Sequence, residues 1–310
     1  MPRVAIVGTG LIARSWTIIF ARSGWDVSLS DPSREVLGSA PGLIREALHD
    51  LAAHGLVENP AGAAERVRVA RSLSEALDGV DFVQENGPER LEAKRAIFTE
   101  LDRMAPRGAI LASSTSAIVP SLFTDSLPGR ARCLVAHPVN PPHLVPVVEL
   151  CGAPWTDPAV VARARAIYES LGQAPITVHR EIDGFVLNRL QAALLAEAFR
   201  LVGEGVVDPR DLDRTVKDGL GLRWSFMGPF QTIELNAPGG MSDYCARYAP
   251  FFRRLGGDPA TDEVWTDANV AKVLTAWGVT ATRESIADKS ALRDRLLTAL
   301  RAYKATQPEL

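Results

Sequence analysis

The sequence predicts an α/β protein whose first part is a doubly wound sheet and whose last part is an all-α C-terminal domain. Two patterns carry this prediction. Short apolar strand patterns alternate with amphipathic helix patterns over residues 4–178, as a doubly wound parallel sheet requires. From residue 184 onward the periodicity is helical. We therefore expect two domains, 1–183 and 184–310.

The most informative motif stands at the start of the chain. The segment RVAIVGTGLIARSWTIIFARSGWDVSLSD has the pattern of a strand, a glycine turn, a helix and a second strand that ends at an acidic residue. Gly8 permits the tight turn, and Gly10 lets the backbone approach a pyrophosphate at the start of the helix. Asp31 can accept hydrogen bonds from the adenosine ribose, which favours NAD over NADP, although Arg34 leaves residual use of NADP open. The segment predicts a Rossmann-type NAD-binding domain, with Ala13 in place of the third glycine.

The other elements of the first domain follow from the same two periodicities. Strand patterns predict strands at residues 4–7, 27–30, 67–69, 82–85, 110–113, 133–137, 145–150 and 175–178. Helix patterns predict helices at residues 11–23, 43–53, 73–77, 91–104, 119–124 and 159–171. Because the two patterns alternate, we expect the sheet to be parallel.

The second domain begins with a long apolar helix. The pattern predicts this helix over residues 185–205, followed by helices at 209–219, 229–236, 241–252, 267–277 and 285–305. Residues 185–202 are apolar on most faces, so we expect the helix to be buried on several sides, in part by the second subunit of a homodimer.

Composition narrows the class of protein. The chain has 310 residues, of which 46% are hydrophobic and 23% charged, and a formal net charge of −3, which gives no electrostatic reason to bind nucleic acid or a membrane surface. It has no apolar run of about 18 residues and no basic, apolar leader, so we expect a cytoplasmic protein. Cys133, Cys151 and Cys245 lack metal-ligand spacing, and we expect buried, reduced thiols and no metal site.

Four segments hold polar residues in apolar or proline-rich surroundings. They are ENGPERLEAK (85–94), SSTSAI (113–118), VAHPVNPP (135–142) with VVEL (147–150), and GFVLNRL (184–190). The carboxyl ends of parallel strands open onto the ligand crevice, so we expect Glu85, residues 113–116 and His137 to face the nicotinamide. Asn188 lies within an apolar helix and needs partners, because a buried, unpaired amide costs about 1–3 kcal/mol.

The order and spacing of these segments resemble the L-3-hydroxyacyl-CoA dehydrogenase superfamily. The resemblance consists of the SxTS segment, His137, Glu149, and Asn188 within FVLNRL. Five further segments are similar to its lambda-crystallin branch, which includes L-gulonate 3-dehydrogenase and related reductases of free keto acids. They are GTGLIARSW, AHPVNPP, GFVLNRLQ, GLGLRWSFMGP and LNAPGGMSDYCARY, and together they span nearly the whole chain.

The resemblance implies a role for individual residues. His137 is implied to exchange a proton with the substrate hydroxyl, and Glu149 to hydrogen-bond the other imidazole nitrogen. Ser116 and Asn188 are implied to hydrogen-bond the reacting oxygen. The implied NAD contacts are the amides of Leu11 and Ile12 and the residues Asp31, Glu89, Lys94, Ser116 and Asn140.

The departures from the family pattern bear on the substrate. Members that act on acyl-CoA place lysines on the helix after the second strand, where they meet the phosphates of CoA. This chain has no lysine before Lys94 and offers only Arg34 and Arg45 in that stretch, so we expect it to bind a CoA nucleotide poorly. In GLGLRWSFMGP, Arg223 is a candidate clamp for a substrate carboxylate and Trp224 a candidate wall of the pocket. The alternative is a surface arginine whose stem covers an apolar patch.

The sequence therefore favours an NAD-dependent enzyme that interconverts a free L-3-hydroxy acid, such as L-gulonate or a short 3-hydroxy acid, and its 3-keto form. A biosynthetic β-ketoreductase or diketoreductase acting on a keto ester, and a 3-hydroxyacyl-CoA dehydrogenase, stay open because the same motifs serve them. L-Carnitine would need an aromatic or acidic cage that we do not find in the sequence. A crystallin-like structural or nucleotide-binding protein is the non-enzymatic alternative, and the presence of both His137 and Glu149 argues against it.

Overall fold

The chain folds into two compact units. The structure is a computed structural model that describes residues 1–278 and 282–308. The first unit comprises Met1–Leu187 and Leu292–Ala302, and the second comprises Asn188–Ala291 and Tyr303–Leu310. The sequence did not predict that a segment near the C-terminus belongs to the first unit.

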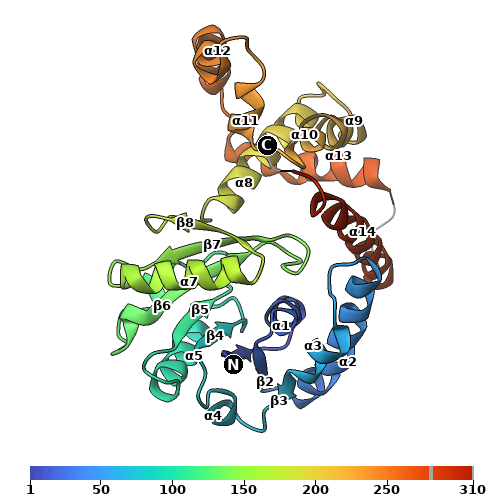
Figure 1. The fold of residues 1–310 in the computed structure, drawn as a ribbon. Helices are drawn as coiled ribbons and strands as arrows, with labels where there is room; N and C mark the ends of the chain where they lie inside the picture. The colour runs from blue at the N-terminus through green and yellow to red at the C-terminus, as the bar shows by residue number, and fades with distance from the viewer. Residues whose placement is uncertain (279–281, 309–310) are drawn as a thin grey trace. The chain divides into compact units, whose positions relative to one another are not determined.

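The first unit is built on one eight-stranded sheet (Figure 1). The strand order is β3-β2-β1-β4-β5-β6-β7-β8, and all neighbouring strands are parallel except β6 and β7. The expectation of a parallel sheet is wrong at this one pair, because the connecting loop is too short to hold a crossover helix and the chain turns back on itself. The strands are β1 (Arg3–Val7), β2 (Asp26–Ser30), β3 (Val67–Val69), β4 (Phe82–Glu85), β5 (Ile110–Ser113), β6 (Cys133–Pro138), β7 (Val147–Gly152) and β8 (Ala174–Val178).

Helices of the first unit follow the predicted positions with three exceptions, which are the start of α2 and the two unpredicted helices α3 and η1. They are α1 (Leu11–Arg22), α2 (Arg34–Ala53), α3 (Pro60–Glu65), α4 (Leu73–Ala76), α5 (Leu91–Met104), α6 (Ser121–Thr124), the 3₁₀ helix η1 (Arg130–Arg132) and α7 (Pro158–Ser170). The predicted start of α2 at residue 43 is wrong. The helix begins at Arg34, because the Ser33 side chain caps it by accepting a hydrogen bond from the amide of Val36. It continues through Pro41, next to the buried Ala40. The short α3 was not predicted, although Asn59 before a proline is a recognisable helix start.

Side chains from alternate strand positions pack into two hydrophobic clusters, one on each face of the sheet. In β1, Val4 and Ile6 belong to one cluster, whereas Ala5 and Val7 belong to the other, because successive residues of a strand point to opposite faces. Helices α1, α2, α3 and α7 contribute to the first cluster, and α4, α5 and α6 to the second. The sheet is thus covered on both sides, and the carboxyl ends of β1, β4, β5 and β6 meet at one edge.

The described part of the second unit has helices joined by turns and loops, and no strand. Its helices are most of α8 (Leu187–Gly203), then α9 (Pro209–Arg214), the π-helix η2 (Thr215–Leu220), α10 (Gly221–Trp224), α11 (Pro229–Glu234), α12 (Gly240–Gly256), the 3₁₀ helix η3 (Asp262–Trp265), α13 (Asp267–Trp277) and the start of α14 (Arg283–Lys304). The π-helix was not predicted, because apolar periodicity over so few residues does not separate it from an α-helix.

One expectation about burial in this unit is wrong, and the other, burial of α8 in part by a second subunit, stays a prediction. Val202 is the one buried residue of α8, and Leu190 is 65% exposed, so the helix is not buried on several sides within the single chain. Apolar periodicity predicts an apolar face and does not show which molecule covers it. Cys245 is exposed, unlike Cys133 and Cys151, because it lies on α12, where no residue is buried.

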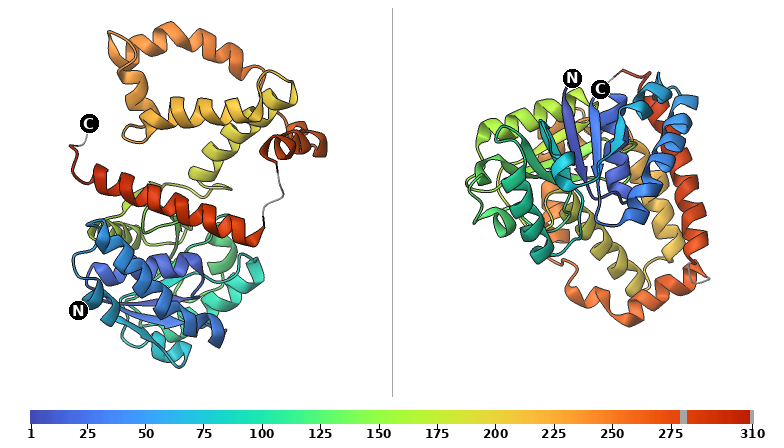
Figure 2. Two further views of the ribbon diagram at one scale, coloured as in Figure 1. Left: turned by 90° about the vertical axis from the view of Figure 1, so that its right-hand side faces the viewer. Right: turned by 90° about the horizontal axis from the view of Figure 1, so that it is seen from below.

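The last part of α14 packs on the first unit. Leu297 contacts the hydrophobic cluster to which α1 and α2 contribute. The Arg301 guanidinium donates to the Gly172 carbonyl at 3.2 Å. Figure 2 shows this helix, in red, running beside the blue helices of the first unit. None of the described helices combines the length and the apolar character that a membrane-spanning helix needs.

Candidate active site

The turn after β1 is shaped by two glycines with different surroundings. Gly8 has a φ of +89°, and a Cβ atom there would lie 2.8 Å from the backbone oxygen of Asn86, so only glycine fits. A Cβ atom on Gly10 would meet nothing within 4 Å. Gly10 is the N-cap of α1 and has no side chain with which to cap the first turn. The amides of Leu11 and Ile12 therefore start the helix beside open space, as binding of a pyrophosphate requires.

A cavity of about 1200 Å³ lies in front of this turn. Its chemistry fits the adenosine half of a dinucleotide, because apolar side chains can hold the base, a carboxylate the ribose, and helix-start amides the pyrophosphate. The residues that supply these groups include Gly8, Gly10, Asp31, Arg34, Leu37, Leu73, Asn86 and Pro88.

Asp31 follows β2 directly and is held in place by the glycine turn. Its Oδ2 accepts hydrogen bonds from the amide and hydroxyl of Thr9 at 2.7 and 3.0 Å, and its Oδ1 accepts the amide of Ser33 at 2.8 Å. A carboxylate has about four acceptor positions, so Asp31 can still accept a ribose hydroxyl. Its charge opposes a 2′-phosphate, whereas Arg34 on the same cavity would attract one.

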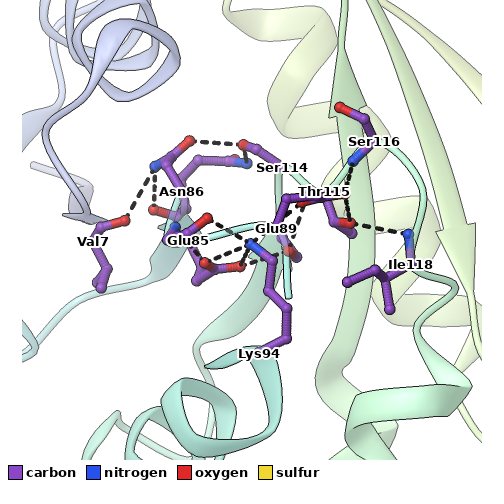
Figure 3. A network of polar contacts seen from close by, with 12 residues as sticks. Val7, Glu85, Asn86, Glu89, Lys94, Ser114, Thr115, Ser116 and Ile118 are labelled. Atoms are coloured by element: carbon purple, nitrogen blue, oxygen red, sulfur yellow. Dashed lines mark hydrogen bonds and ion pairs between the residues drawn. The ribbon is translucent and has the colours of Figure 1, made fainter. Parts of the chain in front are cut away.

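The turn after β4 contains a buried ion pair (Figure 3). Lys94 donates to Oε1 and Oε2 of Glu85 at 2.8 and 2.9 Å, and the two side chains are 1% and 0% exposed. Ser113 and the amide of Gly87 also donate to the Glu85 carboxylate. The expectation that Glu85 and Ser113 face the nicotinamide is wrong, because both are fully buried and bonded to each other.

Glu89 fixes the backbone around Ser116. Its Oε1 accepts the Thr115 hydroxyl at 2.6 Å and the amides of Ser116 and Ala117 at 2.9 and 3.0 Å (Figure 3). Ser116 itself is exposed, as is Asn140 in the loop after β6. The roles that the resemblance implies for Glu89, Lys94, Ser116 and Asn140 toward the cofactor stay predictions.

His137 and Glu149 form a buried pair at the sheet edge. They occupy directly opposite positions of the antiparallel strands β6 and β7, which puts their side chains on the same face. His137 Nδ1 lies 2.7 Å from Glu149 Oε2, and the two side chains are 5% and 0% exposed. A buried carboxylate at this distance selects the tautomer with the proton on Nδ1. Among the described residues His137 Nε2 has no hydrogen-bonding partner, so it is available to a ligand.

The second oxygen of Glu149 is held by the chain that leads into α8. Oε1 accepts the amides of Val186 and Leu187 at 2.9 and 3.0 Å. Burial alone would raise the pKa of the Glu149 carboxyl, but the hydrogen bonds from His137, Leu187 and Val186 outweigh it and lower the pKa. Phe185, whose φ is +49°, places its ring 5.5 Å from the imidazole. The carboxylate thus stays charged beside the imidazole.

Sequence reasoning missed several residues that support the site. Phe185, Trp16, Gln84 and Tyr168 are fully buried, and each contacts a residue of the sheet edge. A polar residue inside an apolar strand, as at Gln84, was the one signal available, because buried amides need partners.

Three predicted substrate residues lie in the second unit. Asn188 is half-buried in the first turn of α8, and Arg223 and Trp224 end α10, where both are exposed. The roles of these residues toward the substrate stay predictions.

A dinucleotide-binding sheet with a buried histidine–glutamate pair at its carboxyl edge defines an NAD-dependent oxidoreductase. Comparison with known proteins gives the family. Residues 3–182 match the NAD binding domain of 3-hydroxyacyl-CoA dehydrogenase, and residues 184–270 match its C-terminal domain. The chain belongs to the 3-hydroxyacyl-CoA dehydrogenase family. It is an NAD-dependent oxidoreductase of this type, acting on CH–OH groups.

Individual relatives are similar along nearly the whole chain. Lambda-crystallin of Oryctolagus cuniculus is 42% identical over 97% of this chain and 96% of its own length. L-Carnitine dehydrogenase of Streptomyces coelicolor is 37% identical over 99% of this chain and 96% of its own. Among solved structures, 5-formyl-3-hydroxy-2-methylpyridine 4-carboxylic acid 5-dehydrogenase, described as an NAD⁺-dependent dismutase, is 28% identical with a TM-score of 0.85, covering 99% of this chain and 100% of that one.

Proposed function

We propose that the protein interconverts a free L-3-hydroxy acid and its 3-keto form, with His137 as the general base in oxidation and the general acid in reduction. The observation that carries the proposal is the His137–Glu149 pair, with Nδ1 bonded to a charged carboxylate and Nε2 available. NAD, when bound, accepts the hydride from the carbinol carbon. His137 Nε2 takes the hydroxyl proton, so the alcohol loses one hydride and one proton to become the ketone.

Glu149 assists in two ways. It holds the imidazole in one tautomer, and its charge stabilises the imidazolium that forms when His137 takes the proton. Because the carboxylate is itself anchored by the amides of Val186 and Leu187, it cannot turn away from the ring without losing two hydrogen bonds. Ser116 and Asn188 are proposed to orient the reacting oxygen.

The proposal of a free acid rests on charge. Helix α2 follows β2 and carries only Arg34 and Arg45 as strong cations, whereas several phosphate charges of a CoA nucleotide would need more. We assign recognition of the substrate carboxylate to Arg223, which can bind it bidentately, next to Trp224. The relatives support a small substrate, since one is named for L-carnitine, itself a 3-hydroxy acid.

The test is an assay with NAD and L-gulonate, L-3-hydroxybutyrate, L-carnitine and L-3-hydroxybutyryl-CoA, and with NADH and a 3,5-diketo ester in reverse. Turnover of a free acid without turnover of the thioester is expected. A preference for the thioester would contradict the proposal, and activity on the diketo ester alone would favour a ketoreductase. Binding of NADH with no turnover of any compound would favour the crystallin-like alternative.

Arg223→Ala tests the assignment of the carboxylate. Loss of a bidentate, charge-assisted contact should raise KM for the free acid by about 10-fold or more and leave the Kd of NADH unchanged. Arg214→Ala is a matched control, because Arg214 is also exposed and pairs with Asp211 on α9. An unchanged KM for every acid turned over would remove Arg223 from the site.

A homodimer remains part of the proposal. Three leucines of α8, Leu190, Leu194 and Leu195, are 65%, 38% and 40% exposed in the single chain, and a second copy is the partner that we propose covers them. Light scattering should give about twice the chain mass of 33.4 kDa. A single-chain mass at working concentrations would refute the dimer.

A further inference from the structure

A chain of hydrogen bonds runs from the hydrophobic core of the first unit to the cofactor turn. Tyr168 on α7 donates to Gln84 Oε1, and Gln84 Nε2 donates to Ser114 Oγ at 2.8 Å. Ser114 donates to Asn86 Oδ1 at 2.8 Å, and Asn86 Nδ2 lies 2.9 Å from the Gln84 carbonyl and 3.4 Å from that of Val7. Figure 3 shows the last part of this relay, from Ser114 through Asn86 to Val7.

Each hydrogen bond of the relay has only one possible donor and one possible acceptor, because some of its groups can only donate and others can only accept. The indole of Trp16 on α1 also donates to Ser114 Oγ, at 3.0 Å. The backbone carbonyls of Gln84 and Val7 can only accept, so Asn86 must turn its amide nitrogen toward them and its Oδ1 toward Ser114. Ser114 therefore donates its one proton to Asn86 and accepts from Trp16 and Gln84.

Tyr168 stands at the core end of the relay. Its side chain is fully buried, and burial holds its pKa well above the ordinary value, against the opposing effect of its hydrogen bond to Gln84. The phenol therefore stays protonated. Because Gln84 Nε2 is committed to Ser114, Gln84 Oε1 faces the phenol, which donates to it.

The relay ends on the wall of the cofactor cavity. Val7, Gly8 and Asn86 all line that cavity. The backbone oxygen of Asn86 is the atom that a Cβ on Gly8 would strike, and the amide of Asn86 donates to the Val7 carbonyl at 2.7 Å. The hydrogen bond from Trp16 links Ser114, the hub of the relay, to α1, whose first turn starts the pyrophosphate site.

We infer that the Tyr168–Gln84–Ser114–Asn86 relay is a positioning device for NAD, which holds the glycine turn and α1 at the spacing that the cofactor needs. Its residues do not take part in proton or hydride transfer. Without the relay the turn would adopt more than one arrangement, and binding of NAD would have to select among them.

Ser114→Ala is the first test. It removes the hub and leaves Trp16 Nε1, Gln84 Nε2 and Asn86 Oδ1 without their partner, so the Kd of NADH, followed by nicotinamide fluorescence, should rise on the order of 10-fold. Once NAD is saturating, kcat should stay within about twofold, because the transferring groups are untouched. Ser114→Thr keeps the hydroxyl and should restore the affinity.

Thr156→Val is the matched control for general destabilisation. Thr156 is a buried hydroxyl of the first unit that bonds Ala153 and Cys133 and does not line the cofactor cavity. It should lower Tm as Ser114→Ala does but leave the Kd of NADH unchanged. Equal NADH affinities of Ser114→Ala and Thr156→Val would overturn the inference and leave the relay a structural feature only.

Tyr168→Phe keeps the fold if Ser114→Ala does not, since the two side chains differ by one hydroxyl. It should raise the Kd of NADH several-fold, because the buried Gln84 Oε1 loses its donor. In a Ser114→Ala background the same change should add little, because the hydroxyl that links Gln84 to Asn86 is already gone. Additive losses, or no loss from Tyr168→Phe, would contradict a directed relay.

Discussion

Two buried carboxylates lie on strands β4 and β7 of the same sheet, with β5 and β6 between them, and show what separates support from chemistry. Glu85 at the end of β4 is paired with Lys94, and Glu149 on β7 is paired with His137. Each carboxylate also accepts hydrogen bonds from backbone amides: Gly87 for Glu85, and Val186 and Leu187 for Glu149.

The difference lies in the basic partner. The Lys94 ammonium bonds Glu85 twice and the Gly87 carbonyl at 3.0 Å, which uses its three protons. The imidazole bonds Glu149 through one nitrogen and keeps the other for a ligand. A buried ion pair therefore supports the fold when its cation is fully bonded, and it can move a proton when the base has a second, available nitrogen.

Lys94→Met tests the supporting pair and should have the largest effect on stability. It leaves Glu85 buried and without its cation, which costs about 3–5 kcal/mol of unfolding free energy. Denaturant unfolding measures this loss. Arg103→Met, which breaks the exposed Arg103–Glu100 pair at 2.7 Å, should leave the free energy of unfolding almost unchanged, because water screens an exposed ion pair. Similar losses in the two variants would break the distinction.

Glu149→Gln tests the second pair. A glutamine has one acceptor oxygen, so it cannot serve both His137 and the amides of Val186 and Leu187. We expect kcat to fall about 100-fold, near 2.7 kcal/mol, with the Kd of NADH unchanged.

Glu85→Gln is the control for this variant. It should lower the free energy of unfolding and leave kcat within about twofold, because the Glu85 carboxylate takes no part in proton transfer. A fall of about 100-fold in kcat for Glu85→Gln, or an unchanged kcat for Glu149→Gln, would show that the two carboxylates do not divide support and chemistry in this way.

The sequence predicted much of the fold and part of this comparison. The eight strands lie within two residues of their predicted bounds, because each combines an apolar run with clear turn signals. The His137–Glu149 hydrogen bond was expected and is present. The burial of Glu85 was not expected. Strand periodicity places a residue at the sheet edge but does not show that Lys94 and Ser113 cover it. The relay through Ser114 joins residues far apart in the sequence, a contact that local patterns do not carry.

The smallest expected effect is on the pH dependence of stability, and it comes from His143 in the loop between β6 and β7. Its Nδ1 lies 3.0 Å from Ser15 Oγ on α1, and burial, with Arg22 and Arg293 acting against Asp294, lowers its pKa from 6.5 to about 4. The unfolded chain takes up a proton below pH 6.5, whereas the native protein does so only near pH 4, so stability is lost as the pH falls through this window. His143→Gln should make Tm a few degrees less dependent on pH between 6.5 and 4. An identical pH dependence would exclude His143 as its source.

The most direct measurement compares kcat with the Kd of NADH in His137→Gln, using the hydroxy acid that the wild-type protein turns over. We predict that kcat falls about 10²–10⁴-fold, as expected for loss of a general acid–base group, while the Kd of NADH stays within about twofold. Retained turnover would contradict the role of His137, and a parallel loss of NADH binding would mean that the imidazole supports the cofactor site instead of moving the proton.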